Sequence, residues 1–283
     1  MKLTVDSGST KTDWGFFNTR DDLKTVKTQG INPCHQKEDE IRGIILNELI
    51  PVVQDIDLKA IKEVFYYGAG CATESICTQM ADILKEFLPD ASIMVDSDML
   101  GAARALCGRS EGVACVLGTG SNSCLYNGRD IVDQVPSLGY ILGDEGSASA
   151  LGRRLIGDCL KRQLPEPVCT EFMSKYSLTK DSIIESVYRK PMANRYIAGF
   201  APFLIEKRAI PEVHKMLISC FTDFFVRNVI NYHKPWLPVH FIGSLAYSFA
   251  DELKETADSL GMTIGKIEAS PMSGLVYYHN IPD

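Results

Sequence analysis

The segment at residues 3–17 constrains this chain more than any other part of it. An apolar run ends at Asp6, a tip of turn-forming residues follows, and a second apolar run comes after the tip, so the segment predicts a β-hairpin. Gly8 lets the tip approach a ligand closely and turn several backbone N–H groups toward it. Thr10 and Lys11 add a hydroxyl and an ammonium group. The tip is therefore suited to binding phosphate.

Asp6 stands where the first strand of this hairpin ends. A carboxylate there cannot bind phosphate directly, but it can hold a Mg²⁺ ion, usually through water, that neutralises the phosphates. An ordinary Ser/Gly hairpin loop with a surface aspartate explains the same residues equally well. The segment by itself leaves both interpretations open.

The composition narrows the classes of partner. Of 283 residues, 45% are apolar and 23% are charged, as in soluble globular proteins with one large domain or two of ordinary size. Subtracting 36 acidic from 29 basic side chains gives a net charge of −7, which argues against nucleic acid or an anionic membrane as the main partner. No apolar run approaches the roughly 20 residues that span a bilayer.

The nine cysteines and five histidines form no recognisable metal-binding motif. The cysteines are odd in number, scattered from Cys34 to Cys220 and never spaced as C-x-x-C, and no histidine lies in an H-E-x-x-H frame. The first residues also lack the pattern of a signal peptide. We therefore expect reduced thiols in a cytoplasmic protein without a zinc or iron–sulfur site.

Hydrophobic periodicity predicts an α/β protein with a repeated order of elements. Three strands, a helix at residues 38–53, a strand, a helix, a strand and a helix account for the first half. After the short Gly-containing segment at 108–112, a strand, a Gly-rich tip and a strand start again at Val113. Helices at 147–163, 196–206 and 212–233 precede two further strands, which a helix at 247–260 separates. We predict two domains, 1–108 and 109–283, with a cleft between them and a helical insertion in the second.

Four motifs in this order resemble those of the sugar kinase, Hsp70 and actin superfamily, in particular its branch of N-acetylglucosamine kinases and BadF/BcrA-type ATPases. They lie at residues 6–12 (DSGSTKT), 117–122 (LGTGSN), 143–148 (GDEGSA) and 241–245 (FIGSL). The resemblance implies two duplicated ribonuclease H-like domains, the actin-like ATPase fold, with ATP and Mg²⁺ in the cleft. The first loop departs from the usual D-G-G-G-T-K pattern, since Ser7 and Ser9 replace glycines, but its backbone donors remain.

The resemblance also assigns the residues that bind ATP. Two phosphate-binding tips and the turn after the strand at 239–242 would contact the nucleotide, with the apolar segment at 197–202 as a further wall, and Asp6 would hold Mg²⁺. That apolar segment is more often core than ligand contact. The predicted ATP-binding residues are Gly8, Ser9, Thr10, Lys11, Gly118, Thr119, Gly120, Ala201, Gly243 and Ser244.

A sugar pocket follows from the same resemblance. The predicted substrate-binding residues are Asn32, Asp98, Ser121, Gly139, Tyr140 and Asp144. Two of these have other interpretations. Cys34 competes with Asn32 for the position of the family's asparagine, and Asn32 can be an ordinary turn residue. Asp144 can cap the helix that follows it.

Asp98 is predicted to be the catalytic base that accepts the proton of the attacking hydroxyl. It competes for this role with Asp96, because both lie between a predicted strand and a helix. Asp98 precedes the segment at 99–103 (MLGAA), which matches the kinase pattern. Helix capping is the plainer use of either carboxylate.

The resemblance implies an ATP-dependent kinase that phosphorylates the 6-hydroxyl of N-acetylglucosamine or a related amino sugar, and it allows for a homodimer. One alternative is a BadF/BcrA-type ATPase that activates a partner enzyme. Such proteins carry cysteines for a shared iron–sulfur cluster, whereas Cys71 and Cys77 are the one close pair here. The other alternative is a sugar sensor without enzymatic activity. Related repressors carry an N-terminal helix-turn-helix, for which we expect no room before the first loop.

Overall fold

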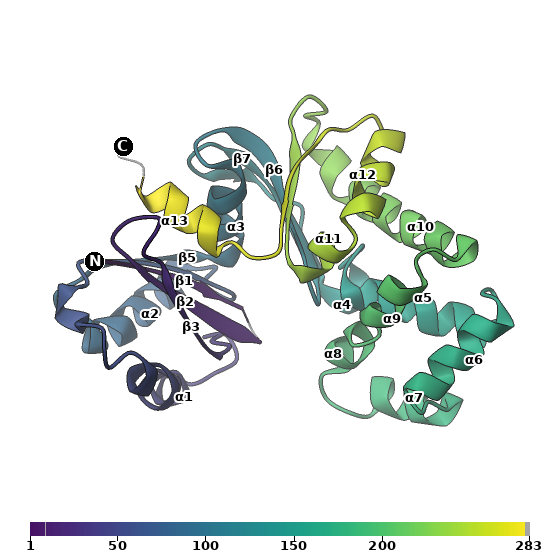
Figure 1. Cartoon of the computed structure of the whole chain (residues 1–283), viewed down its shortest axis with the longest axis horizontal. Helices are drawn as coiled ribbons and strands as arrows, with labels where there is room; N and C mark the ends of the chain where they lie inside the picture. Colours follow the sequence, from purple (N-terminus) through teal and green to yellow (C-terminus); the bar gives the residue numbers. More distant parts are fainter. Residues whose placement is uncertain (9, 281–283) are drawn as a thin grey trace. The chain divides into compact units, whose positions relative to one another are not determined.

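The computed structural model describes residues 1–8 and 10–280 of the chain (Figure 1). Contacts divide the chain into two compact units. The N-terminal unit comprises Met1–Ser110, Asn127–Ile131 and the segment from Ser270, and the C-terminal unit comprises Glu111–Tyr126 and Val132–Ala269. In the described part of the chain, no helix is both long enough and apolar enough to cross a membrane.

Two mixed five-stranded sheets share one topology. The order is β3-β2-β1-β4-β5 in the first sheet and β8-β7-β6-β9-β10 in the second. In each sheet the last two strands run parallel to the first strand and are reached through helices. This match confirms the predicted duplication, while the predicted cleft stays a prediction. The strands are β1 (Lys2–Ser7), β2 (Lys11–Phe17), β3 (Lys24–Gln29), β4 (Glu63–Gly68), β5 (Ser92–Ser97), β6 (Glu111–Leu117), β7 (Ser121–Asn127), β8 (Ile131–Asp133), β9 (Val239–Ile242) and β10 (Ile264–Glu268).

The first sheet is covered on both faces, because alternate residues of a strand point to opposite sides. Val5 of β1 and Trp14 of β2 are fully buried in a core that they share with α1 (Glu38–Ile44) and α2 (Glu74–Phe87). On the other face, α3 (Asp98–Cys107) and α13 (Met272–Asn280) contact β1. Figure 1 shows α13 in yellow beside the purple strands of this unit.

The C-terminal helix changes the predicted domain assignment. The observed break at Ser110 lies two residues from the predicted boundary, but the prediction placed all of 109–283 in the second domain. Met272 and Val276 of α13 instead bury their side chains against Phe17 of β2. The last helix therefore belongs to the N-terminal unit.

The helix predicted at residues 38–53 is not one continuous α-helix. It ends as α1 at Ile44, continues as a π-helical turn at Ile45–Leu49 and finishes as a 3₁₀ turn at Ile50–Val52. Pro51 gives the physical reason, since proline has no N–H and its ring clashes with the carbonyl four residues earlier.

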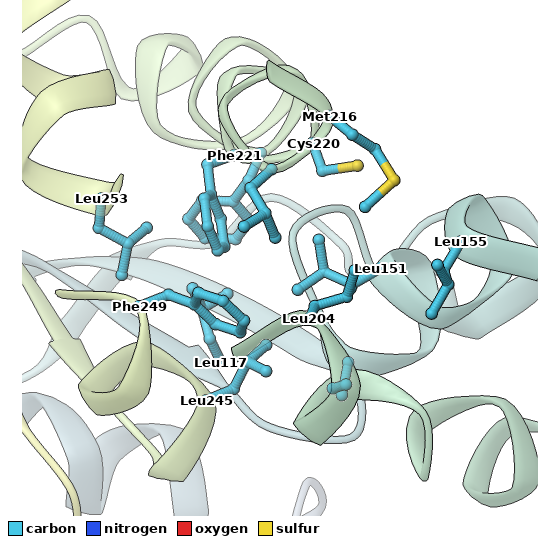
Figure 2. Packing of buried hydrophobic residues seen from close by; sticks show 14 of the residues in the cluster. Leu117, Leu151, Leu155, Leu204, Met216, Cys220, Phe221, Leu245, Phe249 and Leu253 are labelled. Atoms are coloured by element: carbon cyan, nitrogen blue, oxygen red, sulfur yellow. The ribbon is translucent and has the colours of Figure 1, made fainter. Parts of the chain in front are cut away.

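The core of the C-terminal unit lies between the second sheet and its longer helices. Figure 2 shows Phe221 and Phe249 facing one another, and their ring centroids are 5.8 Å apart. Leu151 and Leu253 complete this part of the core and have no exposed surface. Leu151, Phe221 and Leu253 lie on α5 (Ala148–Leu160), α10 (Pro211–Arg227) and α12 (Ala250–Ser259), and Phe249 immediately precedes α12.

The helical insertion contains more elements than the sequence predicts. The helices predicted at 196–206 and 247–260 are each divided, the first into α8 and α9 and the second into α11 and α12. Pro202 stands in the first turn of α9, where its missing N–H costs nothing. The remaining helices are α4 (Gly139–Leu142), α6 (Glu166–Lys175), α7 (Lys180–Tyr188), α8 (Ala193–Ala198), α9 (Ala201–Lys207) and α11 (Ser244–Ser248).

Candidate functional site

The tip between β1 and β2 is a tight turn. The Gly8 N–H donates to the Lys11 carbonyl at 2.9 Å, and the side chains of Thr10 and Lys11 are exposed. The Ser7 side chain is not available to a ligand, because its hydroxyl is buried and lies 2.8 Å from the Thr12 hydroxyl. The tip thus offers a hydroxyl and an ammonium to a ligand, while the serine that replaces a glycine stabilises the turn. The predicted contact Ser9 lies outside the described residues.

Asp6 is half-buried at the end of β1. Its cross-strand neighbour is Asp13 of β2. Burial is the main cause that raises the pKa of Asp6 to about 7, the charges of Asp13 and Asp98 raise it further, and Lys11 opposes them. Two further carboxylates thus act on Asp6 in the N-terminal unit, an arrangement that favours a cation.

The turn that precedes α3 separates the two candidate bases. The helix is capped by Ser97, whose Oγ accepts from the Leu100 N–H at 3.2 Å, so neither aspartate is the N-cap. Asp98 stands in the first turn and accepts from the Met99 N–H at 2.9 Å. Asp96 lies 3.7 Å from the guanidinium of Arg104.

Solvent reaches the Asp98 side chain, although enough protein surrounds it that desolvation raises its pKa, partly offset by the Met99 N–H. A carboxylate that is accessible and has a raised pKa can accept a proton near neutral pH. Asp96 also has a raised pKa, through burial that outweighs the attraction of Arg104. The ion pair with Arg104 distinguishes Asp96 from Asp98.

Asn32 lies in a turn that uses its side chain. Its Oδ1 accepts from the Cys34 N–H at 3.0 Å, and its own N–H donates to Gln36 Oε1 at 2.7 Å. Gly70, at φ +84°, leaves the space that Asn32 Oδ1 occupies, since a Cβ there would collide with it. These contacts favour the turn interpretation of Asn32.

The second tip predicted to bind phosphate, between β6 and β7, is hydrogen-bonded to the start of α5. The Gly118 and Thr119 carbonyls accept from the N–H groups of Ala148 and Ser149 at 2.9 and 3.1 Å. Gly118 itself donates to the Gly120 carbonyl at 2.9 Å. The tip is therefore fixed relative to the loop that precedes α5.

Asp144 meets this tip. Its Oδ1 accepts from the Ser121 N–H at 3.2 Å, and Gly120 leaves it room, since a Cβ there would lie 2.8 Å from Oδ2. Asp144 is 9% exposed, and burial raises its pKa while the Ser121 N–H opposes the shift. Ser147 caps α5 by accepting from the Ala150 N–H at 3.1 Å. The structure thus brings Asp144 and Ser121 together and gives the helix cap to another residue.

Backbone strain is concentrated in the loop that carries Asp144. Leu138 and Asp144 have positive φ angles of 60° and 53°, conformations that cost a non-glycine residue on the order of 1 kcal/mol or more each. The Asp144 N–H donates to the Ser137 carbonyl at 3.0 Å, and Arg153 donates to the Tyr140 carbonyl at 2.7 Å. These two hydrogen bonds stabilise the loop that contains Gly139 and Tyr140, the first residues of α4. Such strain is typical of functional loops.

The turn after β9 is built around Gly243. Its φ of 122° and its close approach to the Leu117 carbonyl exclude any side chain, so backbone can approach a ligand there. Ser244 begins α11 and is exposed. Ala201, in contrast, is 3% exposed and packs in the hydrophobic core, which favours the core interpretation of the segment at 197–202.

Sequence reasoning missed Asp13, which is 3% exposed and ion-paired with Lys11 at 2.7 Å. A charged residue inside an otherwise apolar strand was the signal that could have found it.

The pair Asp6 and Asp13 also bears on whether the N-terminal unit can hold Mg²⁺. Among the described residues, no three His, Cys, Asp or Glu side chains gather closely enough to hold a metal by themselves. Two carboxylates nevertheless fit an ion that nucleotide phosphates and water also bind.

Comparisons with known proteins give the family. Models of known protein families do not match the chain, and neither do curated proteins. A putative N-acetylglucosamine kinase from Porphyromonas gingivalis is 48% identical, with a TM-score of 0.94 over 99% of this chain and 98% of that chain. A putative N-acetylglucosamine kinase from Chromobacterium violaceum is 17% identical, with a TM-score of 0.63 over 98% of each chain. A ROK family glucokinase from Streptomyces griseus, solved with glucose and AMPPNP, is 13% identical, with a TM-score of 0.55 over 98% of this chain and 97% of that chain, and it shows the fold alone.

The two distant structures share the fold, including its duplicated sheets. The P. gingivalis structure goes further, because it is 48% identical over 99% of this chain. The chain belongs to the family of the Porphyromonas gingivalis protein, within the superfamily of sugar kinases, Hsp70 and actin.

Proposed function

We propose that this protein is an ATP-dependent sugar kinase that phosphorylates the 6-hydroxyl of N-acetylglucosamine or a related amino sugar. The observation that carries the proposal is the 48% identity to a putative N-acetylglucosamine kinase. The geometry supports it, since Asp144 contacts the second phosphate-binding tip through Ser121. A sugar acceptor beside a phosphate loop is what phosphoryl transfer to a sugar requires.

The proposed residues divide into those that act on the phosphates and those that act on the sugar. Asp98, accessible to solvent and with a raised pKa, accepts the proton of the attacking hydroxyl. Lys11 and the backbone of both tips bind ATP phosphates, and Asp144 accepts hydrogen bonds from sugar hydroxyls. When bound, Mg²⁺ supplies charge neutralisation to the phosphates, and Asp6 would hold it.

The proposal is tested by measuring ADP release against a panel of hexoses and N-acetylhexosamines. We expect turnover that depends on N-acetylglucosamine or a close relative, and ³¹P NMR should identify a 6-phosphate. Sugar-independent ATP hydrolysis would instead indicate an ATPase activator, and sugar binding without ADP release would indicate a sensor. Either result would reject the kinase.

A further inference from the structure

Asp13 is a buried carboxylate with an unused oxygen. It is 3% exposed, and its Oδ1 is inaccessible to solvent and has no hydrogen-bond partner. A buried acceptor that stays unpaired destabilises the fold, and more so when it is charged. Such a group in a folded protein calls for a specific partner.

Lys11 accounts for the other oxygen only. Its Nζ donates to Asp13 Oδ2 at 2.7 Å, and the Lys11 side chain is 57% exposed. The ammonium of an exposed side chain therefore pairs with one oxygen of Asp13, and the buried Oδ1 is left without a donor. An ion pair with Lys11 does not explain why this carboxylate is buried.

The unused oxygen belongs to a sheet face that also carries Asp6. Asp6 and Asp13 are cross-strand partners, and Thr4 and Asp6 are two residues apart on β1, so all three side chains share one face. Thr4 is fully buried, and its Oγ1 also lacks a partner. Asp98 adds a third negative charge that acts on Asp6. This face thus gathers acceptor oxygens and negative charge with too few donors.

We propose that Asp13 is a second carboxylate of the magnesium site, paired with Asp6. The inference rests on the proposed function for its ligand, which is MgATP. Two carboxylates with nucleotide phosphates and water match the way Mg²⁺ is bound in enzymes that use ATP. Without nucleotide, Lys11 neutralises the charge of Asp13. With MgATP bound, the ion would neutralise it.

The test is the Mg²⁺ dependence of ATP affinity, measured by calorimetry without sugar in excess Mg²⁺ and in EDTA. For Asp13→Asn we expect the gain in affinity from Mg²⁺ to fall about tenfold or more, while affinity in EDTA stays equal or rises because a negative charge is removed. Asp55→Asn is the matched control, since it also removes a Lys–Asp pair, Lys24 to Asp55 at 2.6 Å, but at an exposed site. It should leave both affinities unchanged.

An unchanged gain from Mg²⁺ in Asp13→Asn would overturn the proposal. An equal loss in EDTA and in Mg²⁺ would also overturn it, because Asp13 would then act only by holding Lys11. Circular dichroism checks folding, and Asp13→Ser gives the same comparison if the Asn variant does not fold. Wild-type protein that binds MgATP but phosphorylates no sugar would reject the kinase and leave the assignment of Asp13 standing.

Discussion

A methyl group at Gly120 should disable the proposed sugar site by displacing Asp144. In Gly120→Ala the added Cβ would lie 2.8 Å from Asp144 Oδ2 and 3.1 Å from its Cγ and Oδ1. Contacts below 3.0 Å force a shift, and the backbone of Asp144 is held by a hydrogen bond to Ser137. The carboxylate must therefore rotate away from the Ser121 N–H.

The hydrogen bond that is lost sets the size of the expected fall in sugar affinity. The Ser121 N–H donates to a carboxylate at 3.2 Å, and a hydrogen bond to a charged group contributes about 1.5–3 kcal/mol. At about 1.4 kcal/mol for each factor of ten, sugar affinity should fall roughly ten- to a hundredfold if Asp144 positions the sugar. ATP affinity should change less, because the tip keeps its bonds to the start of α5.

Calorimetric titration of sugar, without nucleotide, measures the effect. Gly118→Ala is the matched control in the same tip, since an added Cβ there meets no atom within 4 Å. A double-mutant cycle with Asp144→Ala tests whether Gly120→Ala acts through Asp144, because the effect of Gly120→Ala should then largely vanish in the Asp144→Ala background. Wild-type sugar affinity in Gly120→Ala would refute the role of Asp144.

Three further sets of substitutions test the proposed base Asp98, the raised pKa of Asp6 and the turn at Gly243. Asp98→Asn should lower kcat by orders of magnitude with near-normal binding of ATP and sugar, whereas Asp96→Asn should be mild; near wild-type kcat in the first variant would reject the base. Asp6 has a pKa of about 7 in the folded protein and about 4 unfolded, so folding takes up a proton between these values and stability falls as pH rises through this window. Melting temperatures measured in EDTA from roughly pH 4.5 to 7.5 should show this fall, and Asp6→Asn should flatten it; equal slopes would contradict the assignment. Gly243→Ala should destabilise the fold by about 1–3 kcal/mol in urea unfolding, whereas Gly157→Ala, in open space within α5, should stabilise it by about 0.5–1 kcal/mol; equal effects would show that the turn tolerates a side chain.

The order of strands and helices could be predicted from the sequence because it follows from local patterns. Alternation of apolar residues marks strands, and a period near four marks helices. The glycine tips were equally readable, since Gly120 and Gly243 occupy places where a side chain collides with its neighbours. The motif at residues 143–148 indicated Asp144 through its resemblance to the kinases, and the role of Asp144 in sugar binding stays a prediction.

Features that depend on distant contacts were not readable in this way. The position of α13 depends on contacts of Met272 and Val276 with Phe17, far away in the chain. The alternative interpretation, in which an aspartate caps α3 or α5, is wrong because Ser97 and Ser147 supply the caps. Several polar residues precede each helix, and only geometry selects one. The cytoplasmic location and the homodimer stay predictions.

The return of α13 to the first sheet affects how the protein is made. A ribosome completes the C-terminal unit before α13 emerges, so Phe17 lacks its apolar partners during most of synthesis. Nascent chains should therefore expose this face of the first sheet to chaperones until the last helix arrives. A fragment ending near Ser110 would carry the same uncovered surface, and expression of the N-terminal unit alone should include α13.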